Sequence, residues 1–115
     1  MKDYKMSFNV EDKEYSLIFN LNVMEEIQEE YGTIEKWGAL TDNQGKECNA
    51  KALIFGLTAM INEAIDIENE ENGSNLPFVT RKQVGRLVTR AGLQKSAEAL
   101  NNAVIEATKS DEKNA

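Results

Sequence analysis

Residues 15–32, YSLIFNLNVMEEIQEEYG, change their hydrophobic period within a few positions. The first part alternates apolar and polar residues, as a strand with one buried face does; its apolar members are Tyr15, Leu17, Phe19 and Leu21. The second part has helical spacing, with apolar residues at Val23, Met24, Ile27 and Tyr31. Asn22 lies at the switch with Glu25 three positions later, a pattern typical of a helix N-cap. A strand leading directly into an amphipathic helix predicts a small α+β domain.

The rest of the chain extends this prediction in both directions. Residues 5–10 alternate and precede a charged turn at residues 11–14, which predicts an N-terminal β-hairpin. We expect a compact bundle of about four to five helices to follow, over residues 22–31, 34–40, 49–68, 80–91 and 93–108. Polar loops are expected at residues 41–47 and 68–77, and Ile105 is expected to face inward on the last helix. The predicted organisation is one α+β domain over residues 1–109 with a disordered tail at 110–115.

Length and composition limit the possible classes of protein. The chain has 115 residues, with 41% hydrophobic and 29% charged residues, as expected for one globular domain. Its single cysteine, Cys48, excludes an internal disulfide, and the N-terminus shows no signal-peptide pattern. We therefore expect a cytoplasmic protein that does not cross a membrane. A net charge of −7 opposes non-specific binding to nucleic acid.

The sequence offers little material for catalysis. It contains no histidine, so the commonest general base and metal ligand are both missing. It also lacks phosphate-binding glycine motifs. The acidic run from Asp66 has Glu71 where a calcium loop requires glycine at its sixth position. We expect no enzymatic activity, no cofactor and no metal site.

The expected helix at residues 49–68 has two neighbouring apolar stripes. One contains Leu53, Leu57, Met60, Ala64 and Ile67, and the other contains Ile54, Ile61 and Ile65. Such a wide arc fits a central helix covered on two sides by its own domain. It also fits a helix that offers one stripe to a partner. On the second interpretation, the partner-binding residues are Ile54, Ile61 and Ile65, with Met60 as an adaptable contact.

All three arginines fall within residues 81–90. Lys82, Arg86 and Arg90 are spaced four apart, so they form one basic stripe on an expected helix. The stripe fits a solvated face partly paired with Glu68, Glu70 and Glu71, or a docking surface for an acidic partner. A DNA-binding helix-turn-helix is a further alternative, although the glycine spacing and the short inter-helix turn fit that motif poorly.

Four segments carry a resemblance to a known family. They are EYSLIFNLNVMEEIQEEYG, ALIFGLTAMINEAIDIENEENG, TRKQVGRLVTRAGL and ALNNAVIEATK, in this order between about Phe8 and Lys109. Together they resemble the tail assembly chaperones of long-tailed bacteriophages and prophages of Gram-positive hosts. INEAIDIENEENG is the most distinctive part.

The resemblance implies a non-enzymatic protein of the host bacterial cytoplasm that is absent from the mature virion. Its partner would be the tape measure protein, a long and hydrophobic chain that is kept in solution until tail tube subunits polymerise around it. The tail tube protein is a second possible partner. The alternative from another class is a small self-assembling structural protein that uses the same apolar arc and the hairpin edge to form a homo-oligomer.

Overall fold

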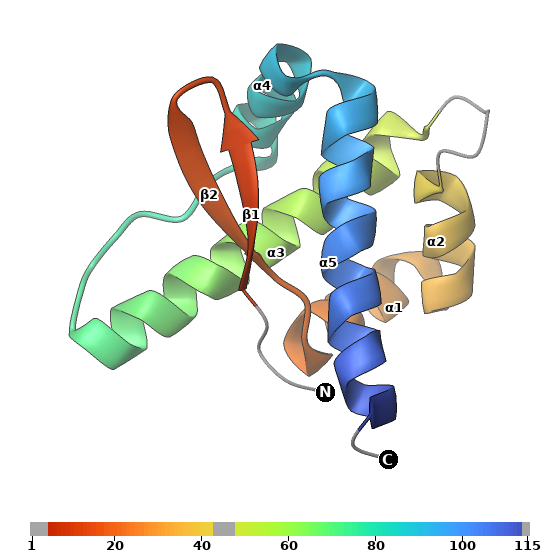
Figure 1. Ribbon diagram of the computed structural model, residues 1–115, viewed down its shortest axis with the longest axis horizontal. Coiled ribbons are helices and arrows are strands. Elements are labelled where there is room, and N and C mark those ends of the chain that lie inside the picture. Colours follow the sequence, from red (N-terminus) through yellow and green to blue (C-terminus); the bar gives the residue numbers. More distant parts are fainter. Residues whose placement is uncertain (1–4, 43–47, 114–115) are drawn as a thin grey trace.

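A hairpin and a set of helices make up the computed structural model, which describes residues 5–42 and 48–113. The antiparallel hairpin consists of β1 (Lys5–Val10) and β2 (Lys13–Ile18). Five helices follow in the described residues: α1 (Leu21–Tyr31), α2 (Ile34–Thr41), α3 (Ala50–Asn72), α4 (Arg81–Ala91) and α5 (Leu93–Lys113) (Figure 1). This order confirms the predicted α+β fold.

The hairpin has one face against the helices and a tight turn at its tip. Phe8 and Leu17 are fully buried on the packed face. The register pairs Val10 with Lys13, leaving Glu11 and Asp12 as the two turn residues. Glu11 has φ 58, in the left-handed region that favours glycine. β2 packs against α3 and α5, and β1 packs against α5 and α4, so the hairpin is held by the helices, as a two-stranded sheet requires.

The strand-to-helix switch occurs two residues earlier than expected. Asn20, not Asn22, is the N-cap of α1, and its Oδ1 accepts from Val23 N at 3.2 Å. Asn22 lies inside the helix, where its Nδ2 donates to Glu63 Oε2 at 2.9 Å. Both residues are asparagines, which cap well, and both side chains also donate to Glu63 of α3, so residue type alone does not identify the cap. Gly32, with φ 90, ends α1 as predicted.

The centre of the molecule is α3, which crosses beneath the hairpin (Figure 1). Trp37 of α2 is 1% exposed, and its Nε1 donates to Ala52 O of α3 at 3.0 Å. This close approach depends on Gly56, because a Cβ there would lie 2.5 Å from Trp37 Cζ2. The core therefore centres on α3, and buried residues of the hairpin and of the other described helices pack around it.

The α3–α4 connection (residues 73–80) is tied to α3 by two asparagines. Asn62 Nδ2 donates to Val79 O at 3.0 Å, and Val79 N donates to Asn62 Oδ1 at 2.8 Å. Asn69 makes the same pair of bonds with Leu76, at 3.1 and 2.9 Å. The spacings agree, because two helical turns and three extended residues both span about 10 Å. Residues 69–72 are helical and not part of the expected loop.

The last two helices follow directly from one another. Thr80 and Gln83 form the predicted capping box of α4, and Gly92 alone joins α4 to α5. α5 continues to Lys113, so residues 110–113 belong to a helix instead of the disordered tail that we expected. Asn114, Ala115 and most of the expected 41–47 loop lie outside the described residues.

Across residues 5–42 and 48–113, no helix is both long and apolar enough to span a bilayer.

Candidate functional site

The four residues predicted to bind a partner do not form an open apolar flank. Met60 is 0% and Ile61 1% exposed, so neither offers an open apolar surface in the closed fold. Ile54 and Ile65 are partly buried against the core. The physical reason is that β2 and α4 both pack on α3 and cover its two apolar stripes. The wide arc thus belongs to a central helix covered on two sides.

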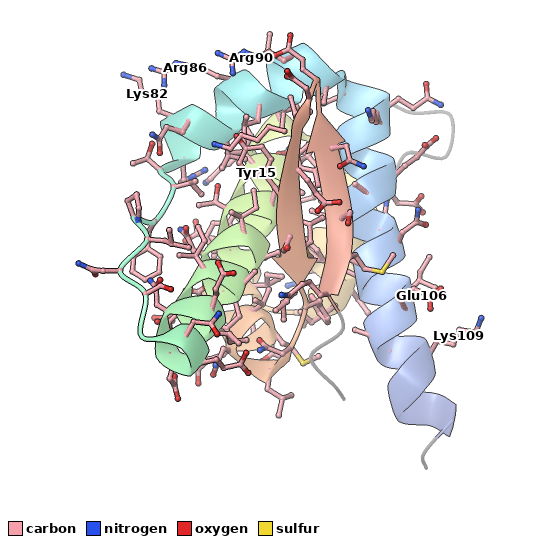
Figure 2. All side chains as sticks on the ribbon, turned by 60° about the vertical axis from the view of Figure 1, so that its left-hand side comes forward. Tyr15, Lys82, Arg86, Arg90, Glu106 and Lys109 are labelled. Atoms are coloured by element: carbon pink, nitrogen blue, oxygen red, sulfur yellow. The ribbon has the colours of Figure 1, made fainter. Side chains whose placement is uncertain are left out.

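The predicted basic stripe is exposed along α4. Figure 2 shows Lys82, Arg86 and Arg90 side by side on the outer surface of this helix. Within the described part of the chain none of them forms an ion pair, so the expected pairing with the glutamates at the end of α3 is not formed. An uncompensated row of cations is available to a partner.

A groove of about 650 Å³ brings parts of both predictions together. Its floor is α3, and its walls are the hairpin, mainly the outer edge of β2 with Lys5 of β1, the α3–α4 connection and α4. Ile61 and Ile65 line the floor, while Arg86 and Arg90 line the α4 wall. Lys82, Ile54 and Met60 are not among its lining residues. We name this space the basic groove, because its charged lining consists of Lys5, Lys13, Arg86 and Arg90 against Glu14 and Glu68.

The most exposed apolar side chains of the groove come from the α3–α4 connection. Leu76 is 45% and Phe78 56% exposed. Pro77 lies between them, and all three line the basic groove. The asparagine pairs at Leu76 and Val79 hold this segment extended, so its side chains cannot collapse onto the core. It presents apolar surface from a fixed backbone, as a binding site requires.

Sequence reasoning missed this segment because it was treated as a polar loop. A signal was present: Leu76, Phe78 and Val79 are apolar around the only proline, directly before a capping box. The two asparagines seven positions apart on α3 were a second signal, since that spacing places them on one face of a helix.

A second groove, of about 540 Å³, has the opposite charge. Phe78 lines it too, together with Phe55 and Ala59. Among the described residues, its carboxylates are Glu26, Glu29, Glu30, Glu63 and Asp66, and its cation is Arg81. We name it the acidic groove.

Crowding of like charges affects one of these carboxyls. Partial burial raises the pKa of Glu26 above its ordinary value of 4.5, and Glu63, Glu25 and Glu29 raise it further. Asn20 and Asn22 each donate to Glu63 Oε2, at 2.7 and 2.9 Å, which holds that carboxylate in place. The surface of α1 is therefore strongly anionic.

Cys48 and the acidic residues are the remaining candidates for reactivity or metal binding. Cys48 is buried, and burial raises the pKa of its thiol, so the thiol stays protonated near neutral pH. Among the side chains that the structure describes, no three Cys, Asp or Glu residues gather as metal ligands would. The acidic residues 66–71 are part of α3 and do not form a loop.

The connection between α4 and α5 bears on the DNA-binding alternative. Gly92 alone separates the two helices, whereas a helix-turn-helix normally has three to four residues in its turn. This geometry disfavours that motif.

Comparison with models of protein families, with curated proteins and with solved structures gave no match.

Proposed function

We propose that this protein is a non-enzymatic tail assembly chaperone that binds the tape measure protein of a phage or prophage in the host cytoplasm. Its support comes from the four sequence segments described above and from a surface suited to an apolar client. The observation on which the proposal rests is the exposed pair Leu76 and Phe78 beside the basic groove. A chaperone that shields hydrophobic chain must keep such a surface uncovered.

The client-binding surface differs from the one that periodicity suggested. The flank of α3 that contains Ile61 is covered, so we assign client binding to the α3–α4 connection and the groove next to it. Leu76 and Phe78 are large side chains with about half of their surface free. Covering them with a client removes apolar area from water at about 25 cal/mol per Å².

The anionic exterior supports the same function. Glu25, Glu29 and Glu30 are exposed on α1, and the protein has a net charge of −7. Like-charged surfaces repel one another, which opposes aggregation of loaded chaperones. In this arrangement Leu76 borders the basic groove, and Phe78 lies between the basic and acidic grooves, next to the anionic surface of α1.

Co-expression tests the proposal. The wild-type protein should keep the tape measure protein encoded by the neighbouring gene in the soluble fraction and co-purify with it. Replacement of both Leu76 and Phe78 by serine should abolish co-purification. Leu21→Ser is the matched control, because Leu21 is 66% exposed on α1 and lines neither groove. A tape measure protein that stays insoluble with the wild type would refute the proposal.

Solution mass distinguishes the self-assembly alternative. A defined homo-oligomer that forms without a client, and that the Leu76/Phe78 serine variant disrupts, would assign the exposed segment to self-association. A protein that is monomeric alone and forms a soluble complex only when the client is present would support the chaperone function.

A further inference from the structure

The outer edge of β2 forms one wall of the basic groove. Residues 13–16 all line the groove, including neighbours whose side chains point to opposite faces of the sheet. A groove lined by consecutive strand residues borders the strand's edge; Lys5 of β1 also lines it, so the groove reaches part of one face of the hairpin as well.

That edge carries unpaired backbone groups. Val10 and Lys13 flank a two-residue turn, so they form a hydrogen-bonded pair, and the pairing then alternates along the hairpin. Glu14 and Ser16 fall at the alternate positions and direct their N–H and C=O groups away from β1. The sheet has two strands, and within residues 5–42 and 48–113 no other backbone pairs with this edge.

Apolar side chains face the edge across the groove. Leu76, Pro77 and Phe78 form the opposite wall, Ile65 lies on the floor, and Tyr15 lies on the β2 side. Figure 2 shows Tyr15 beside the hairpin, below α4 and on the side of α3. A chain lying between the two walls would find backbone partners on one side and apolar surface on the other.

The positive charge of the groove favours a bound segment that carries acidic residues. Four cations and two carboxylates line it, although the whole protein has a charge of −7. Arg86 and Arg90 belong to the α4 wall, and the turn end of β2, where Lys13 begins the strand, lies beside α4 (Figure 1). The positive charge is therefore strongest at one end of the groove, which favours a carboxylate there.

We propose that the basic groove binds an extended segment of the client by strand addition to the outer edge of β2. The segment alternates apolar residues, which cover Tyr15, Ile65 and Phe78, and it has acidic residues at the end next to Arg86 and Arg90. Backbone hydrogen bonds to Glu14 and Ser16 supply affinity for extended chain of varied sequence, and the charge sets the direction. This inference rests on the proposed function, because it specifies how the client is bound.

The charge requirement is tested with matched variants of one helix. The probe is a fluorescein-labelled peptide of about eight residues, Asp-Asp-Val-Thr-Leu-Thr-Val-Thr, measured by fluorescence anisotropy. Arg86→Glu and Arg90→Glu should each weaken its binding at least about tenfold. Lys82→Glu changes the charge equally on the same exposed stripe but does not line the groove, so binding should stay within about twofold. Equal effects of all three variants would overturn the proposal.

The backbone requirement is tested on the peptide, which leaves the protein unchanged. N-methylation of every second residue removes alternate donors. Methylation at one alternating set of peptide positions should abolish binding, and methylation at the other set should leave binding nearly intact. The reason is that only one set directs its N–H groups towards β2. If both sets bind equally, or if a helix-forming peptide of the same charge binds more tightly, the groove does not add a strand.

The full-length client separates the two proposals. If the wild type retains the tape measure protein but the peptide tests fail, strand addition is wrong and the chaperone function stands. If the peptide tests succeed but the client is never retained, the groove binds acidic extended chain and the proposed function is wrong.

Discussion

Two asparagines hold the α3–α4 connection, and they permit a matched test of how the candidate site is kept open. Asn62 and Asn69 each form two hydrogen bonds with one backbone residue of the connection, at 2.8–3.0 Å and 2.9–3.1 Å. The two pairs share geometry and helix but differ in burial, since the Asn62 pair is partly buried and the Asn69 pair is exposed. Replacing each asparagine by alanine therefore shows how much burial adds to the stability that the hydrogen bonds contribute.

The expected loss in free energy of unfolding depends on whether the backbone groups of Val79 and Leu76 find new hydrogen-bond partners. In Asn62→Ala, two bonds of about 1 kcal/mol each are lost, and the unpaired groups of Val79 raise the cost to about 3 kcal/mol. Alanine has a higher helix propensity than asparagine, which offsets about 0.6 kcal/mol. The net loss in free energy of unfolding is therefore about 2 kcal/mol. In Asn69→Ala, water replaces the bonds at Leu76, so the net change should lie within about 0.5 kcal/mol of zero.

Chemical denaturation of the two variants measures these changes, and amide hydrogen exchange at Val79 and Leu76 locates them. Asn62→Ala should speed exchange at both amides, because the connection is released from its buried end. If Asn69→Ala costs as much as Asn62→Ala, burial does not set the strength of these bonds and the reasoning is wrong.

Three further predictions concern stability, each measured by denaturant or thermal unfolding. Gly56→Ala places a Cβ 2.5 Å from Trp37 and should cost at least about 2 kcal/mol, whereas Gly38→Ala, with nothing within 4 Å, should gain up to about 1 kcal/mol; equal effects would contradict the packing. Glu11→Gly relieves a φ of 58 and should stabilise by about 0.5–1 kcal/mol; a loss would mean that the turn is not strained. The raised pKa of Glu26 means that the folded state holds a proton more tightly than the unfolded state, so stability is lost as pH rises above 4.5. Glu26→Gln should therefore be more stable than wild type near neutral pH, with an advantage that shrinks as pH falls towards 4.5; an advantage independent of pH would refute this cause.

Local signals were enough to predict most elements. Alternation predicted β1 at its observed bounds, the Thr80 capping box predicted the start of α4, and Gly32 and Gly92 marked helix ends. Each of these signals acts between residues close in sequence, so the neighbouring residues suffice to interpret it.

The errors occurred where a local feature, such as a helix end or a buried face, depends on contacts with residues distant in the sequence. Asn20 and Asn22 were both suitable caps, and contacts of both side chains with Glu63 on α3 accompany the choice of Asn20. α3 extends to Asn72 because Asn69 pairs with Leu76 and Gly73 then ends the helix in the left-handed conformation. Ile105 was expected to face inward but is 55% exposed, and Ala103 and Ala107 are the buried residues of that part of α5.

The sequence by itself determined that α3 has a wide apolar arc and that α4 carries three aligned cations, because helical periodicity places residues on faces whatever surrounds them. Only the tertiary structure decided that the arc is covered, that Arg86 and Arg90 border a groove while Lys82 does not, and that Leu76 and Phe78 stay exposed. The physical reason is that burial depends on which element packs against a face. That packing is set by contacts such as those of β2 with α3, between segments dozens of positions apart.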